Sequence, residues 1–184
     1  MVEFDKQRWV DKAWERFQKV VRKTNSKKKL AYAEARFYRD SIFISKLKTV
    51  VEWCNSKGIQ VHFGKKAGGV YDANTKNIVI TSHSSPEKQL YYLLHECGHH
   101  LIGFTEHHER FGMGYPQTET PGANQTFHHR LACLEEEIEA WQRGWKLSKR
   151  LKLKIRREEF DELRLECLKT YVQWSNTRIL LKST

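Results

Sequence analysis

The chain has 184 residues and a net charge of +11. Its length suits one domain with a substantial core and is too short for two large ones. Charged residues interrupt the sequence from Asp5 onward, so we expect neither a signal peptide nor a transmembrane helix, and a cytoplasmic protein. The four cysteines are spaced singly, which argues against a disulfide framework and against a cysteine-type zinc ribbon.

Charge is distributed unevenly along the chain. Residues 1–58 carry 15 Lys and Arg against 7 Asp and Glu, and residues 143–184 carry 12 against 5. Residues 59–142 carry 6 against 10 and are therefore acidic. Basic segments of this kind are usually solvated helix faces, and in a minority of proteins they bind nucleic acid.

Two long helices are predicted in the N-terminal third. Apolar residues recur at helical spacing over residues 3–22 and again over residues 30–54, and a Lys-rich polar linker at 23–29 separates the two runs. Gly58 is expected just past the end of the second helix, where glycine is common. The core-facing side chains of that helix are predicted to be Phe37, Ile44, Leu47, Val51 and Cys54.

Alternating apolar and polar residues then predict three short strands, at residues 59–63, 68–72 and 77–81. A turn at 72–75 joins the last two. Two roles fit the third strand: it forms the sheet edge to which an extended peptide adds by main-chain hydrogen bonds, or the sheet only covers the following helix.

The next helix is predicted to begin at Pro86. Proline is favoured at the first position of a helix, and Ser84 with Glu87 three residues later has the spacing of a capping box. Leucines at helical spacing mark this helix as buried.

That helix carries the sequence His95-Glu96-Cys97-Gly98-His99, an H-E-x-x-H motif. Two histidines four residues apart lie on one helical face, so both imidazoles can reach one metal ion, with Glu96 at the rim as the general base. An ordinary core helix with two histidines on its edge is the alternative. Burying these polar groups is costly unless they bind metal, which favours the metal site.

A third metal ligand is needed. The metzincin pattern is absent, because Ile102 and Thr105 stand where it requires Gly and His. After a long loop predicted at 103–125, helices are expected at 126–147 and 156–174, and the first contains a run of glutamates. A face formed by Leu131, Leu134, Ile138, Trp141 and Trp145 would turn Glu136 directly away and place Glu135 and Glu137 on its flanks. Glu135 or Glu137 is therefore the ligand expected from helical position, whereas an isolated glutamate run is usually a solvated face.

The short sheet with Gly-Gly-Val-Tyr at 68–71, the H-E-x-x-H helix and the later Glu137-Ile138-Glu139-Ala140 together resemble the compact gluzincin-type zinc peptidases of the ImmA/IrrE family over residues 59–145. The resemblance implies a zincin-like α+β fold, mostly helical, with a small sheet packed on the motif helix. It selects Glu137 as the third zinc ligand. For the whole chain we expect basic N-terminal helices at 1–58 packed on a zincin-like catalytic core at 59–147, and a basic C-terminal helix at 148–184, within one compact domain.

The mechanism that follows is peptide hydrolysis in a cytoplasmic protein substrate, with one Zn²⁺ held by His95, His99 and Glu137 and with Glu96 as the base. Alternative ligands are Glu135 and, as in SprT-like proteases, His107 or His108. Tyr115, His128 and the neighbouring histidines are the candidates to donate a hydrogen bond to the oxyanion of the transition state. The competing function is a nucleic-acid-binding protein, or a DNA-associated protease, with a structural zinc site. No membrane partner is expected, and the sequence does not indicate an oligomeric state.

Overall fold

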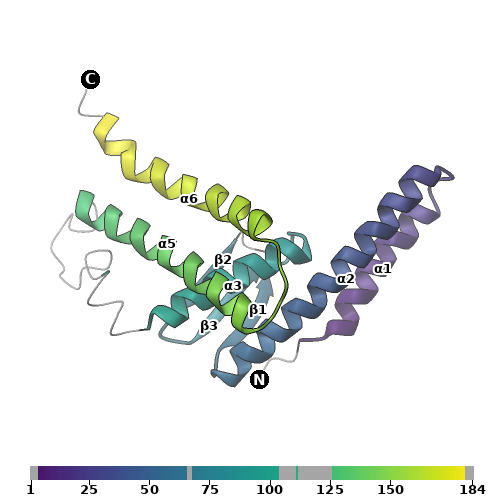
Figure 1. The fold of residues 1–184 in the computed structure, drawn as a ribbon, viewed down its shortest axis with the longest axis horizontal. Helices are drawn as coiled ribbons and strands as arrows, with labels where there is room; N and C mark the ends of the chain where they lie inside the picture. The colour runs from purple at the N-terminus through teal and green to yellow at the C-terminus, as the bar shows by residue number, and fades with distance from the viewer. Residues whose placement is uncertain (1–3, 66–67, 104–110, 112–125, 181–184) are drawn as a thin grey trace. The chain divides into compact units, whose positions relative to one another are not determined.

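The computed structural model describes residues 4–65, 68–103, 111 and 126–180, with side chains as far as residue 175 in the last range. Within these residues it contains five helices and a three-stranded mixed sheet (Figure 1). The expected mostly helical α+β fold is confirmed. The chain divides into two compact units, 1–93 and 94–184, so that the motif helix contributes to both. The organisation with boundaries at 58 and 147 stays a prediction.

Helices α1 (Lys6–Val21) and α2 (Lys27–Ser56) form an antiparallel hairpin in the first unit (Figure 1). The carboxylate of Asp5 accepts a hydrogen bond of 2.9 Å from the backbone N–H of Arg8 and so caps α1. The rings of Trp14, Phe17 and Phe37 contact one another across the hairpin. Both predicted helices are confirmed, and α2 begins inside the stretch expected to be a linker.

The buried face of α2 agrees with its apolar pattern. Ile44, Leu47, Val51 and Cys54 are buried, as predicted. Gly58 follows the last turn with a φ of 72°, a left-handed conformation that suits glycine at the end of a helix.

Strands β1 (Gln60–Gly64), β2 (Gly69–Asp72) and β3 (Asn77–Thr81) form a sheet in the order β1-β3-β2. The carboxylate of Asp72 accepts hydrogen bonds from the backbone and hydroxyl of Thr75, which confirms the predicted turn. β3 pairs in parallel with β1 and antiparallel with β2. The expectation that β3 is an edge strand is therefore wrong, because its backbone is hydrogen-bonded on both sides.

Helix α3 (Pro86–Ile102) begins where predicted, but its cap differs. The hydroxyl of Ser85, not Ser84, accepts a hydrogen bond from the backbone N–H of Lys88. The carboxylate of Glu87 pairs with Arg39 of α2 and does not form a capping box. Near the start of α3, the amide of Gln89 donates a hydrogen bond of 2.9 Å to the carbonyl of Thr81 and ties the helix to the sheet.

Helices α5 (Phe127–Arg150) and α6 (Arg157–Leu180) run antiparallel in the second unit (Figure 1). The hydroxyl of Thr126 caps α5 by accepting a hydrogen bond from the backbone of His129. The ring of Phe160 packs against Trp141 and Trp145 at the opposite end of α5. Both helices were predicted, although each extends further toward its C-terminus than its apolar pattern suggested.

Candidate metal centre

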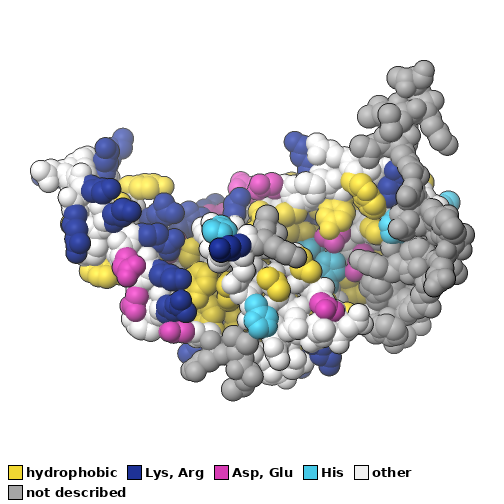
Figure 2. Space-filling model, turned by 180° about the vertical axis from the view of Figure 1, so that it is seen from behind, with side chains coloured by type: hydrophobic (Ala, Val, Ile, Leu, Met, Phe, Trp, Pro, Cys, Tyr) yellow, Lys and Arg dark blue, Asp and Glu magenta, His cyan; other side chains and the backbone are white. Residues whose placement is uncertain are grey.

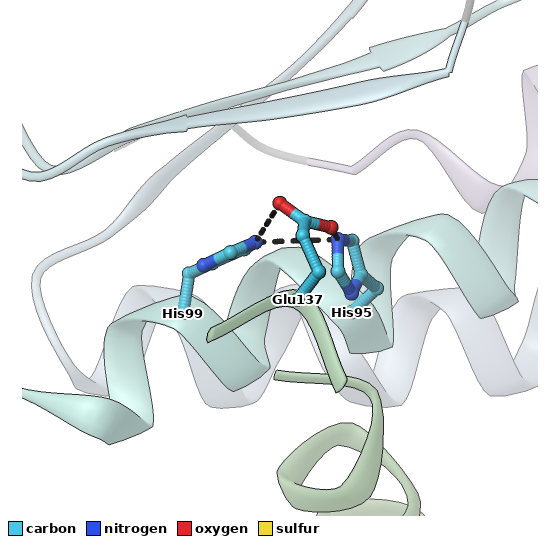
Figure 3. A group of neighbouring side chains, drawn as sticks. All are labelled: His95, His99 and Glu137. Atoms are coloured by element: carbon cyan, nitrogen blue, oxygen red, sulfur yellow. Dashed lines mark hydrogen bonds and ion pairs between the residues drawn. The ribbon is translucent and has the colours of Figure 1, made fainter. Parts of the chain in front are cut away.

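Three side chains of the second unit converge on one point. His95 and His99 come from α3, and Glu137 comes from α5 (Figure 3). The Nε2 atom of His95 lies 3.1 Å from Oε2 of Glu137, and Nε2 of His99 lies 3.4 Å from Oε1 of the same carboxylate. The two Nε2 atoms are 3.2 Å apart. These three residues form a group that can hold a single metal ion.

The spacing of these atoms suits a small tetrahedral cation. Zinc bonds of about 2.0–2.1 Å in tetrahedral geometry place neighbouring ligand atoms about 3.4 Å apart. The separations of 3.1, 3.2 and 3.4 Å among the two Nε2 atoms and the Glu137 oxygens are close to that value. The donor set of two imidazoles and one carboxylate is also one that zinc accepts.

The charges around His99 and Glu137 favour a positive charge between these groups. Burial of the His99 ring acts to lower its pKa, but hydrogen bonds to Glu136 and Glu137 and the charge of Glu96 raise the pKa to about 10. Burial acts to raise the pKa of Glu137, yet the contacts with His95 and His99 lower it. The site therefore holds positive charge strongly, whether a proton or a metal ion supplies it.

A fourth residue, Glu136, supports the site. Its Oε1 lies 3.1 Å from Nδ1 of His99, the ring nitrogen that faces away from the converging atoms. A carboxylate in this position fixes the ring orientation of a metal-binding histidine and makes its other nitrogen more basic. Glu136 is only 4% exposed, so the expectation that it points away from the buried face is wrong.

The reason is that α5 meets α3 through small residues, because Ala140 and Gly144 lie against its backbone. Ala132, Glu136, Ala140 and Gly144 recur every four residues and are all buried, whereas Leu131 of the predicted apolar face is 41% exposed. A helix packed through small side chains brings its backbone, and any carboxylate on that face, close to its neighbour. This small-residue stripe was the signal in the sequence that could have identified Glu136.

Two glycines set the distance between the helices. A Cβ atom at Gly98 of α3 would collide with the carbonyl of Ala140, and one at Gly144 of α5 would collide with the carbonyl of Leu94. The guanidinium of Arg143 also donates a hydrogen bond to the carbonyl of Leu101. Because this carbonyl belongs to the last turn of α3, Arg143 satisfies one of the acceptors left open there.

The other motif residues have defined surroundings. The His95 ring stacks on Trp141 at a centroid distance of 4.4 Å and an interplanar angle of 23°. Glu96 is 4% exposed and close enough for its charge to act on His99. Trp141 therefore restricts the orientation of one imidazole, as Glu136 does for the other.

A cavity of about 360 Å³ opens beside Glu137. Its walls come from α5 and α6 and are largely apolar. Burial, together with the charges of Glu136 and Glu137, raises the pKa of the Cys133 thiol to about 11, so this wall group is uncharged at neutral pH. The lining side chains are Cys133, Glu137, Thr170, Tyr171 and Trp174.

Of the remaining candidates from the sequence, the two that the structure describes do not reach this point. Glu135 is exposed on α5, and His128 is exposed in the first turn of the same helix. His107, His108 and Tyr115 lie outside the described residues. Among the candidates whose side chains the structure describes, only His95, His99 and Glu137 therefore form a group suited to a metal ion.

Comparison of the chain with protein-family models, with curated proteins and with solved structures found no match. In the described part of the chain, none of the helices combines the length and apolar character required to cross a membrane.

Proposed function

We propose that this protein is a zinc-dependent metallopeptidase that hydrolyses peptide bonds of a protein substrate in the cytoplasm. The observation that carries the proposal is the convergence of His95, His99 and Glu137, with a second carboxylate, Glu96, on the motif helix. The same residues carry the resemblance to ImmA/IrrE peptidases, and this resemblance supports the proposed activity.

Zinc held by His95, His99 and Glu137 would supply a Lewis acid and lower the pKa of a bound water to about 7. Residues of the chain itself would move the proton and position the ligands. Glu96 accepts a proton from the attacking water and returns it to the leaving nitrogen, as a general base and then a general acid. Glu136 and Trp141 hold the two imidazoles in position, so that no reorganisation is needed during the reaction.

The cavity beside Glu137 supports a peptide as the substrate. Its volume of about 360 Å³ and its aromatic wall, with Tyr171 and Trp174, suit one apolar side chain of a bound peptide. We therefore expect cleavage next to an apolar residue.

The test uses the full chain, loaded with zinc, and a mixed library of unstructured peptides analysed by mass spectrometry. Glu96→Gln should keep its zinc, measured by elemental analysis, and lose about a thousandfold or more of the cleavage rate. Glu135→Gln is the matched control, because it removes the same charge from an exposed position on α5 and should cleave normally.

Two results would contradict the proposal. Cleavage by Glu96→Gln at the rate of the parent would mean that another group, or a contaminant, is the base. Stoichiometric zinc with no cleavage of any peptide would favour a metal-binding scaffold instead.

A further inference from the structure

A second cavity, of about 600 Å³, lies entirely within the first unit, where α1 meets the sheet and the start of α3. Its lining combines aromatic rings with cations, which the metal centre does not use. The residues of this groove that matter here are the aromatic Phe4, Trp9 and Phe63 and the basic Arg8, Lys12 and Arg16.

The aromatic rings form a continuous cluster. Trp9 lies 4.9 Å from Phe63 in an edge-on arrangement and 5.9 Å from Phe4, on which it stacks. All three rings are only half-buried, so part of the cluster remains open to the cavity. An open aromatic surface of this kind accepts a planar ring by stacking.

The cations form a stripe on one face of α1. Arg8, Lys12 and Arg16 are exposed and spaced four residues apart, about 6 Å along the helix axis from one to the next. The ammonium group of Lys12 stands 6.0 Å from the centre of the Trp9 ring, so charge and aromatic surface adjoin. Among the described residues, no carboxylate lies within ion-pair distance of the Arg8 guanidinium. The guanidinium of Arg16 pairs with the carboxylate of Asp40 at the long distance of 3.5 Å.

The lining of the groove carries three cations, Arg8, Lys12 and Arg16, against two carboxylates, Asp5 and Glu15, so its net charge is positive. Asp5 is engaged in capping α1, and Glu15 is exposed to solvent. Lys and Arg side chains also gather over the α1–α2 hairpin at the left of Figure 2, with fewer Asp and Glu side chains among them. The groove is therefore placed in a positive field that attracts polyanions.

We propose that this groove binds a single-stranded nucleic acid, with bases against the ring cluster of Phe4, Trp9 and Phe63 and phosphates along Arg8, Lys12 and Arg16. A duplex fits less well, because its bases are already stacked on one another and unavailable to the rings. A peptide of acidic residues alone would engage the cations but offers no planar ring to the aromatic surface. The proposal does not depend on the metal centre, whose residues all belong to the second unit.

The test measures binding of the full chain to a fluorescent oligothymidine of about 20 nucleotides, a length that covers at least one binding site of this class. Affinity is determined by anisotropy between about 50 and 200 mM salt. Trp9→Leu keeps an apolar side chain but removes the stacking surface, and should weaken binding about tenfold. Circular dichroism and thermal unfolding verify that this variant folds.

Arg8→Gln combined with Lys12→Gln keeps the test decisive even if Trp9→Leu does not fold, because both positions are exposed. Loss of two phosphate contacts should make the plot of log association constant against log salt concentration less steep, by about 1.4 in slope. The matched control is Lys57→Gln combined with Lys169→Gln, which removes the same charge from exposed positions outside the groove. This control should change the slope little.

Three outcomes would overturn the proposal. The first is an unchanged salt slope for the Arg8 and Lys12 double variant. The second is equal weakening by the control pair, which would indicate only a diffuse effect of net charge. The third is competition by duplex DNA or polyglutamate as effective as by unlabelled oligothymidine, which would assign the groove to another polyanion.

Discussion

Helices α3 and α5 supply the two halves of the candidate metal centre, yet they bury different kinds of surface. In α3 the large apolar residues are inside: Leu90, Leu93 and Leu94 have no exposed surface. In α5 the order is partly reversed, because Leu131 is 41% exposed while Glu136 is 4% exposed. The same rule, that an apolar stripe marks the buried face, therefore succeeds for α3 and fails for α5 at Leu131 and Glu136.

The contrast between α3 and α5 shows that the buried face of a helix depends on its distance from the neighbouring helix as well as on hydrophobicity. Gly98 and Gly144 permit backbone contact between α3 and α5, and backbone contact leaves room only for small side chains. A carboxylate on that face then reaches a histidine of the neighbouring helix, and pairing with it offsets the cost of burial.

The largest effect is expected from removing the carboxylate that α5 contributes. Glu137→Ala should lower zinc affinity about a thousandfold, because zinc binding worth about 10–16 kcal/mol is shared among few ligands. Competition with a chromophoric chelator measures the affinity. An affinity equal to that of the parent would mean that another residue is the third ligand.

Adding a methyl group at the helix contact comes next. Gly98→Ala in an ordinary helix would stabilise the protein by about 1 kcal/mol. Here the new Cβ meets the carbonyl of Ala140, so we expect a loss of about 3 kcal/mol from overpacking. Urea unfolding measures whether the free energy of unfolding rises or falls in this variant. A rise would show that the helices are not in close contact.

Glu136→Gln tests whether the buried neighbour of Glu137 orients His99. Losing the negative partner of Nδ1 should weaken zinc binding about 10–100-fold. Glu135→Gln removes an identical charge one residue earlier, from the exposed side of α5, and should change the affinity little. Equal losses in both variants would attribute the effect to overall charge.

A proton should leave when zinc enters. His99, whose pKa is raised to about 10, carries a proton at neutral pH in the metal-free protein. Its charged contacts then stabilise the fold fully below pH about 6.5, and this stabilisation is lost as the pH rises through about 10. Zinc binding at pH 7.5 should release about one proton, which calorimetry in buffers of different ionisation enthalpy measures. Heats that do not depend on the buffer would contradict a protonated His99.

The smallest effect concerns the start of α3. Ser85→Ala should cost about 1 kcal/mol, because it removes the hydroxyl that accepts the N–H of Lys88. Ser84→Ala should cost almost nothing. Thermal unfolding of the two variants distinguishes them, and the reverse ranking would support the capping box expected from the sequence.

Much of the architecture could be predicted because it depends on local pattern. The helices over α1, α2, α3, α5 and α6 and the three strands follow from apolar periodicity, and Gly58 and the Asp72 turn follow from backbone preferences. The position of β3 between its neighbours could not be predicted, since strand order depends on pairing between segments that are distant in sequence. The same holds for the burial of Glu136.

By itself, the sequence determined that two histidines four residues apart on one helix face the same way, because helical geometry is local. Helical position favoured two glutamates of one helix, Glu135 and Glu137, as the third ligand, His107 and His108 stayed open as alternatives, and the resemblance selected Glu137. Only the tertiary structure placed Glu137 against both imidazoles and Glu136 behind one of them, because this arrangement requires the close contact between α3 and α5. It likewise brought Phe63 of the sheet to Trp9 of α1 and created the basic aromatic groove, which no single segment of the chain encodes.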